Sequence, residues 1–205
     1  MGVYVDGFNL YHGVHAWSGC RHLWLDVVEL AQSLRPRNEV VHVHYFTAPV
    51  LDDSGAASRQ GIYQSALQAR HPDRLTVVQG RYQRKTEECR KCGNSYRRYE
   101  EKETDVSIAA TLVADAARQK YDAALVISAD SDLLPAIKIA RDLQPDLFVL
   151  PAFPPKRNSD EIKRALPAAL HIGKAKIKDA QLPHEVTSAS GKVYRRPSKW
   201  CSAES

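Results

Sequence analysis

The segment Val3-Tyr4-Val5-Asp6-Gly7-Phe8-Asn9-Leu10 begins with three apolar, β-prone residues that run directly into an aspartate and a turn. A second apolar run, Ala123-Ala124-Leu125-Val126-Ile127, leads in the same way to Asp130. Both runs are too short for helices, so each predicts a strand with an acid at its carboxyl end. Ligands of open α/β sheets bind at that edge, where the strand order reverses. The two segments therefore predict a functional site between them.

Strand and helix patterns alternate along the rest of the chain, which predicts an α/β fold with a mostly parallel central sheet. Residues 81–101 break this alternation, and we expect an inserted hairpin or knuckle there. Residues 171–205 are rich in Lys, Ser and Pro, which predicts a basic, loosely ordered tail behind a domain of residues 1–170. The strands are expected over residues 2–6, 39–47, 74–80, 122–128 and 146–150, and the helices over residues 9–17, 25–34, 55–70, 103–119, 131–143 and 159–165.

The bulk properties favour a polyanionic partner. The chain has 205 residues, a formal net charge of +5 and a pI near 9.0. No strongly amphipathic Lys-rich helix stands out, so RNA or DNA is a better partner than a membrane. There is no apolar stretch of membrane-spanning length and no signal-peptide pattern, and the four cysteines are too few for a disulfide scaffold. We therefore expect a soluble, cytoplasmic protein.

Asp105 opens a predicted helix and joins the two strand-end acids by a different argument. At 100° per residue it projects on the same side as Ile108 and Leu112, so we expect it to face the sheet. Asp132 follows two residues after Asp130. Two unit charges about 4 Å apart repel by roughly 4 kcal/mol at an effective dielectric near 20. A cluster of four such carboxylates needs a counter-charge, and Mg²⁺ or Mn²⁺ is the natural one.

Three short motifs, taken together, resemble the NYN domain family, whose members are relatives of the PIN nucleases. The motifs are Val5–Leu10, Glu101–Val106 and Ser128–Asp132, and the resemblance covers roughly residues 1–170. It implies a three-layer PIN-like fold, a metal-dependent ribonuclease activity and an acidic pocket. The pocket residues that it implies are Asp6, Asn9, Asp105, Asp130 and Asp132.

The chain departs from the family pattern at two positions. Ala129 stands where the family commonly has Gly, and Thr111 stands where a further Asp is frequent. Asp115 is a poor replacement for that acid, because ten residues of helix separate it from Asp105 by about 15 Å.

Magnesium keeps several of its waters, so one or two direct carboxylate ligands suffice. We expect Asp6 and Asp130 to be the direct ligands, with Asp105 and Asp132 as outer acids or as ligands of another metal. Asn9 is expected to orient groups or to contact phosphate. Ser128 is a candidate for orienting a carboxylate or for contacting RNA. Each acid also has a simpler explanation as a turn residue or a helix cap.

The pair Cys89-x-x-Cys92 has the spacing of half a zinc site. Cys20, His22, Cys201 or the same pair from a second subunit of a homo-oligomer are candidates to complete a Zn²⁺ site. The alternative is a reduced pair in a basic hairpin that grips RNA through phosphate contacts and base stacking. The basic candidates for this contact are Arg81, Arg84, Arg97 and Arg98. Lys102, at the mouth of the helix that follows, is a separate candidate for contacting the phosphate backbone.

The leading hypothesis is a Mg²⁺- or Mn²⁺-dependent endoribonuclease. The first rival is a catalytically weakened RNA-binding or assembly module, which the Thr111 position motivates. The second rival is a metal-dependent phosphohydrolase that acts on small phosphoesters.

Overall fold

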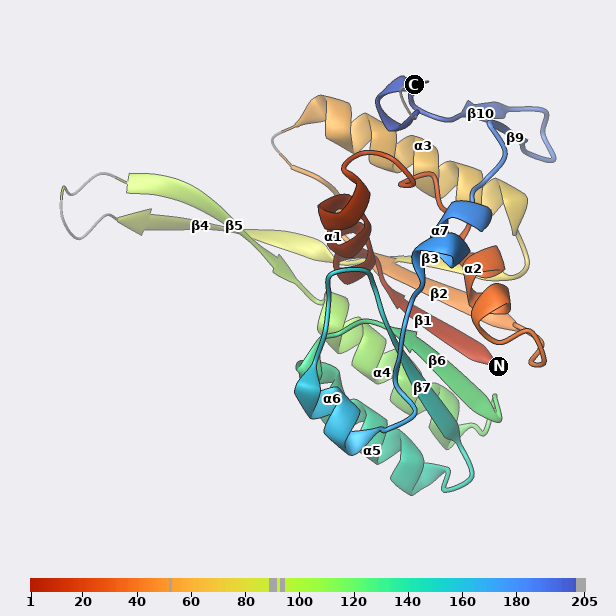
Figure 1. The fold of residues 1–205 in the computed structure, drawn as a ribbon. Coiled ribbons are helices and arrows are strands. Elements are labelled where there is room, and N and C mark those ends of the chain that lie inside the picture. The colour runs from red at the N-terminus through yellow and green to blue at the C-terminus, as the bar shows by residue number, and fades with distance from the viewer. Residues whose placement is uncertain (52, 89–91, 93–94, 202–205) are drawn as a thin grey trace.

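A six-stranded sheet forms the centre of the computed structural model, which describes residues 1–51, 53–88, 92 and 95–201 (Figure 1). Every pairing within this sheet is parallel, and the strand order is β3-β2-β1-β6-β7-β8. The strands are β1 (Gly2–Asp6), β2 (His42–Thr47), β3 (Leu75–Gln79), β6 (Ala123–Ile127), β7 (Phe148–Phe153) and β8 (Leu170–His171).

Helices cover both faces of this sheet. Successive residues of β1 point to opposite faces, so Val3 and Val5 belong to one apolar core and Tyr4 belongs to the other. The first core packs under α1 (Gly7–Ser18), α2 (Val27–Leu34), α3 (Ser54–Arg70) and α7 (Lys174–Asp179). The second packs under α4 (Thr104–Ala117), α5 (Leu134–Leu143) and α6 (Asp160–Ala165). The predicted α/β fold with a parallel sheet flanked by helices is confirmed.

The strand order reverses at β1. The chain goes from β1 to β2 and β3 on one side, whereas β6, β7 and β8 lie on the other side. Val5 of β1 is in register with Ile127 of β6, so the residues that follow these two strands emerge side by side. This is the edge at which open α/β sheets bind ligands.

A long antiparallel ribbon interrupts the α/β alternation and extends away from the body of the protein (Figure 1). It consists of β4 (Arg81–Glu88) and β5 (Ser95–Lys102), paired from Arg81 opposite Lys102 to Glu88 opposite Ser95. The hairpin expected here is therefore present. Cys89 lies outside the described residues, so the cysteine knuckle stays a prediction.

The C-terminal segment is packed against the first core, and the prediction of a loosely ordered tail is wrong for residues 171–201. Ile177 is fully buried and Trp200 is 7% exposed. The Trp24 indole donates to the Pro183 carbonyl at 2.7 Å, which ties the segment to the start of α2. The segment also holds β9 (Glu185–Thr187), β10 (Val193–Arg195) and the short 3₁₀ helix η2 (Ser198–Trp200). Its high Lys and Ser content hid the widely spaced apolar residues that anchor it.

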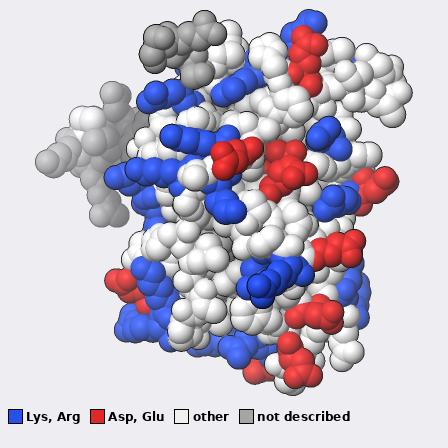
Figure 2. All heavy atoms as spheres, turned by 45° about the vertical axis from the view of Figure 1, so that its right-hand side comes forward, with Lys and Arg blue, Asp and Glu red and all other residues white. Residues whose placement is uncertain are grey.

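Basic side chains on the face in Figure 2 form several groups with acidic side chains between them. The net positive charge is thus not gathered into one continuous patch on this face. Among the described helices, none is long and apolar enough to cross a bilayer.

Ile177→Ala should lower the free energy of unfolding by about 3 kcal/mol, because it leaves a cavity in the core beneath α7. Val193→Ala is the control from the same segment, since Val193 is 41% exposed, and should cost less than about 0.5 kcal/mol. Chemical denaturation measures both values. Equal, small losses would mean that the segment does not contribute to the core.

Candidate active site at the ends of β1 and β6

Asp6 ends β1 and at the same time caps α1. Its Oδ1 accepts a hydrogen bond from the Asn9 backbone N–H at 2.9 Å. The next residue must be small, because a Cβ at Gly7 would lie 2.6 Å from the Phe46 carbonyl oxygen and 2.9 Å from the Tyr45 ring. The absence of a side chain at Gly7 lets α1 begin directly beside β2. Asp6 is only 5% exposed as a result of this close packing.

Ser128, the first residue after β6, joins the two strand ends. Its hydroxyl donates to Asp6 Oδ2 at 2.9 Å and accepts from the Asp130 backbone N–H at 3.1 Å. At 1% exposure the side chain does not reach solvent, so the predicted direct contact with RNA is wrong. Its hydrogen bonds match the other predicted role, the orientation of a carboxylate.

Asn9 makes a second link between the same two segments. Its side-chain oxygen accepts from the Ala129 backbone N–H at 3.2 Å. Because that partner is a donor, the amide oxygen must face Ala129, and the amide NH₂ group is turned the other way. The segments after β1 and β6 therefore hold each other through two independent hydrogen bonds.

Asp130 is half-buried, and it caps the 3₁₀ helix η1 (Ser131–Leu133) by accepting from the Asp132 backbone N–H at 3.0 Å. The simple explanation of this residue as a helix cap is therefore correct. It does not compete with a role in the site, because the cap fixes the carboxylate close enough to Asp6 to act on its ionisation. Asp132 is exposed in the first turn beyond it.

The pKa of Asp6 is raised from its ordinary value of 3.8, first by burial and further by the negative charge of Asp130. The hydrogen bonds from Asn9 and Ser128 oppose this shift, because they stabilise the ionised form. Asp6 is thus a buried carboxylate that feels the charge of a second acid, and a cation bound beside it would favour its ionised state.

Asp105 lies in the first turn of α4, and its side chain is exposed. The prediction that it faces the sheet is wrong, because Thr104 and Ile108 are the buried residues at this end of the helix. The helix itself runs beside β1 and η1. A role for Asp105 as a ligand remains a prediction, and the side chain of Lys102 lies outside the described part of the chain.

Neither Thr111 nor Asp115 supplies the missing family acid. The Thr111 hydroxyl donates to the Ser107 carbonyl of its own helix at 2.7 Å. Asp115 is buried and accepts from the Tyr4 hydroxyl at 2.9 Å, with His44 and Lys120 each 3.5 Å away. These partners hold Asp115 within the sheet–helix interface.

The donor chemistry at the strand ends fits a divalent cation of the magnesium type, which takes carboxylate oxygens and retains waters. Asp6 and Asp130 provide two carboxylates. Hydrogen bonds from the Ser128 hydroxyl and the Asn9 backbone N–H orient that of Asp6, and one from the Asp132 backbone N–H orients that of Asp130. No group of three His, Cys, Asp or Glu side chains able to hold a metal occurs among the described residues.

The zinc prediction gains no partner within the described residues. Cys20 and His22 line a separate pocket beside α1, while Cys92 and Cys201 are exposed. Cys89 is not among the residues described, so zinc binding stays a prediction.

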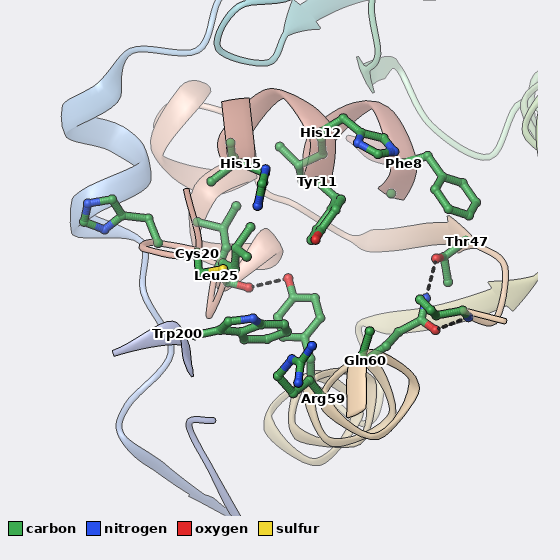
Figure 3. A pocket seen from close by; sticks show the side chains of 18 of the residues that line it. Phe8, Tyr11, His12, His15, Cys20, Leu25, Thr47, Arg59, Gln60 and Trp200 are labelled. Carbon is green, nitrogen blue, oxygen red and sulfur yellow. Dashed lines mark hydrogen bonds between the residues drawn. The ribbon is translucent and has the colours of Figure 1, made fainter. Parts of the chain in front are cut away.

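A pocket of about 470 Å³ next to Asp6 was missed by the sequence reasoning (Figure 3). It lies between α1 and α3, and Trp200 closes one side. The spacing of Phe8, Tyr11, His12 and His15 was a readable signal, because these positions share one face of a helix.

Asp130→Asn should lower the pKa of Asp6 toward its ordinary value, because it removes a neighbouring negative charge. Ser128→Ala should raise this pKa further, because the ionised form loses a hydrogen bond. NMR titration of the Asp6 carboxyl carbon in metal-free protein measures both shifts, and shifts in the same direction would contradict this account.

Folding raises the pKa of Asp6. The contribution of this carboxyl group to the free energy of unfolding should therefore fall as the pH rises from 3.8 through the raised value.

One similar solved structure is a crystal structure of a protein of unknown function from Vibrio parahaemolyticus RIMD 2210633. Its sequence is 16% identical to this one, and the structural alignment covers 88% of this chain and 94% of the other, with a TM-score of 0.57. At this identity the likeness concerns the fold alone.

One similar curated protein is 6-hydroxy-3-succinoylpyridine 3-monooxygenase HspA of Pseudomonas putida (strain DSM 28022 / S16). It is 26% identical over 238 aligned residues, which cover 97% of this chain and 74% of the relative. The NYN domain matches residues 1–172, which include both strand-end segments and the ribbon. The chain therefore belongs to the NYN domain family.

Proposed function

We propose that this protein is a metal-dependent endoribonuclease with a PIN-like fold that hydrolyses RNA phosphodiester bonds at the ends of β1 and β6. Membership of the NYN family indicates a nuclease-like, RNA-related function. The observation that carries the finer proposal is the buried Asp6 carboxylate with Asp130 beside it, at the edge where the strand order reverses.

Asp6 and Asp130 would hold Mg²⁺ or Mn²⁺, with Asp105 and Asp132 as outer acids. When bound, such an ion makes its water a better nucleophile and offsets negative charge on the phosphate oxygens. Ser128 and the Asn9 backbone N–H keep Asp6 in one orientation. The Asn9 NH₂ group is a donor for a non-bridging phosphate oxygen, since its oxygen already faces Ala129.

RNA cleavage with Mn²⁺ should fall at least about 100-fold in Asp6→Asn and in Asp130→Asn, because each removes a charge on which metal and transition-state stabilisation depend. Asn is also a good helix cap, so both variants should remain folded. Asp160→Asn, at an exposed first-turn acid of α6, is the matched control and should cleave normally. End-labelled RNA resolved on denaturing gels gives the rates.

Three outcomes would contradict the proposal. Undiminished cleavage in both site variants would place the reaction elsewhere. RNA binding without cleavage would favour the RNA-binding module. Oxygen-dependent consumption of 6-hydroxy-3-succinoylpyridine with RNA left intact would assign this chain the activity in its relative's name.

RNA binding should depend on the basic ribbon formed by β4 and β5. The double replacement of Arg97 and Arg98 by Ala should reduce the steepness of the plot of log RNA association constant against log salt concentration by about 1.4. The reason is that two contacts with phosphates of a single-stranded RNA are lost. Replacing Lys138 and Arg141, which are exposed on α5, makes the same charge change away from the ribbon and should leave the slope unaltered. Filter binding over a range of salt concentrations measures both slopes, and equal changes would make the effect one of net charge only.

A further inference from the structure

One wall of the pocket is a row of rings along α1. Phe8, Tyr11, His12 and His15 are spaced so that they share a helix face, and all four line the cavity (Figure 3). The Tyr11 ring centroid lies 5.2 Å from that of His12 and 5.7 Å from that of His15. We call these four residues the aromatic row. It presents ring surface to the cavity over two turns of the helix.

The opposite wall comes from α3 and the C-terminal segment. Trp200 packs against Tyr63 with ring centroids 5.9 Å apart, and the Tyr63 hydroxyl donates to the Leu25 carbonyl at 2.7 Å. Gln60 is held by the Ala48 carbonyl and the Val50 N–H, each at 2.9 Å. These contacts fix Trp200 and Gln60 within the second wall, which faces α1 across the cavity (Figure 3).

The inner end of the pocket adjoins the Asp6 site. Gly7 and Phe8 line the cavity and follow Asp6 directly, and the Phe8 backbone N–H helps to stabilise the ionised Asp6. Tyr45 also lines the cavity, and its phenol is close enough to Asp6 for that charge to raise its pKa, after the larger effect of burial. A group attached to a bound ring would thus lie near the carboxylates.

The charged residues of the lining favour an anion on the ligand. Arg59 and Lys199 contribute two cations, against one carboxylate among the described lining residues, that of Asp53, which feels the charge of both. Asp53 is also committed to capping α3, where it accepts from the Ala56 N–H at 2.8 Å. The pKa of His12 is lowered by burial and by Arg157 and His15, so its neutral imidazole offers a donor and an acceptor to a heteroatom.

We propose that this pocket binds a planar nitrogen heterocycle carrying an anionic group, as in a nucleoside monophosphate, with the ring between the aromatic row and Trp200. The anion lies at Arg59 and Lys199. A volume of about 470 Å³ is within the range of small-molecule sites, roughly 300–1,000 Å³. The nucleotide is either free or one unit of an RNA strand, and only the second source rests on the proposed function.

Calorimetric titration of the full chain in EDTA tests the proposal without any hydrolysis. The ligands are uridine and adenosine monophosphates, the matching uncharged nucleosides, inorganic phosphate and a short single-stranded oligoribonucleotide. The monophosphates should bind saturably, and more tightly than either the nucleosides or phosphate. Phosphate binding as tightly as the monophosphates would overturn the proposal, because the ring would then contribute nothing.

Variants connect the binding to the two walls. Tyr11→Ala should weaken monophosphate binding about tenfold through lost stacking, while Tyr11→Phe should retain it. Arg59→Ala should also weaken it about tenfold, but should leave nucleoside binding unchanged. Arg70→Ala, at the exposed far end of the same helix, is the charge-matched control and should bind normally.

The outcomes separate the two sources of the ligand. Oligoribonucleotide binding with the same sensitivity to Tyr11→Ala and Arg59→Ala identifies a unit of RNA as the ligand, whereas binding of monophosphates alone identifies a free nucleotide. Absence of saturable binding by all of these ligands, or equal affinity in wild type and both pocket variants, would overturn the proposal. RNA that binds here in EDTA and stays uncleaved when Mn²⁺ is supplied counts against the nuclease proposal and not against the pocket.

Discussion

The site depends on the link between the ends of two adjacent parallel strands, made by the Ser128 hydroxyl to the Asp6 carboxylate and by the Ala129 N–H to the Asn9 side chain. It forms because β1 and β6 pair in register up to Val5 and Ile127, and the chain leaves both strands at the same level. A one-residue slip would present Val5 or Gly7 to Ser128 and turn the apolar side chains of β1 to the wrong faces. The two apolar cores that enforce the register therefore also enforce the site.

The two acids of the candidate site also cap helices. Asp6 caps α1 and Asp130 caps η1, so each carboxylate is fixed by the helix that it starts. Burial raises the pKa of Asp6, and so does the charge of Asp130, which means that the folded chain holds the ionised Asp6 at an electrostatic cost. The hydrogen bonds from Ser128 and Asn9 offset part of that cost. Functional sites commonly hold ionisable groups in positions that lower the stability of the fold.

Local chemistry explains what was predictable from the sequence. The strands before Asp6 and Asp130 could be predicted because β-prone runs ended at capping residues. The side of α4 on which Asp105 projects was estimated from helical periodicity, but periodicity does not say that the first turn leaves this residue in solvent. Trp200 was missed because its partners are distant in sequence, and composition carries no information on such contacts. The pocket was missed for the same reason, since its second wall needs Trp200 in place.

Helix α1 begins at Asp6 and continues as one wall of the cavity, so the carboxylate and the aromatic row are parts of one rigid element. Any occupant that shifts the first turn of α1 must alter the affinity of Asp6 for a proton. Thermodynamic reciprocity then requires protonation of Asp6 to alter the affinity for that occupant by the same factor. The proton and the occupant are therefore coupled through the start of a single helix, with no need for a larger conformational change.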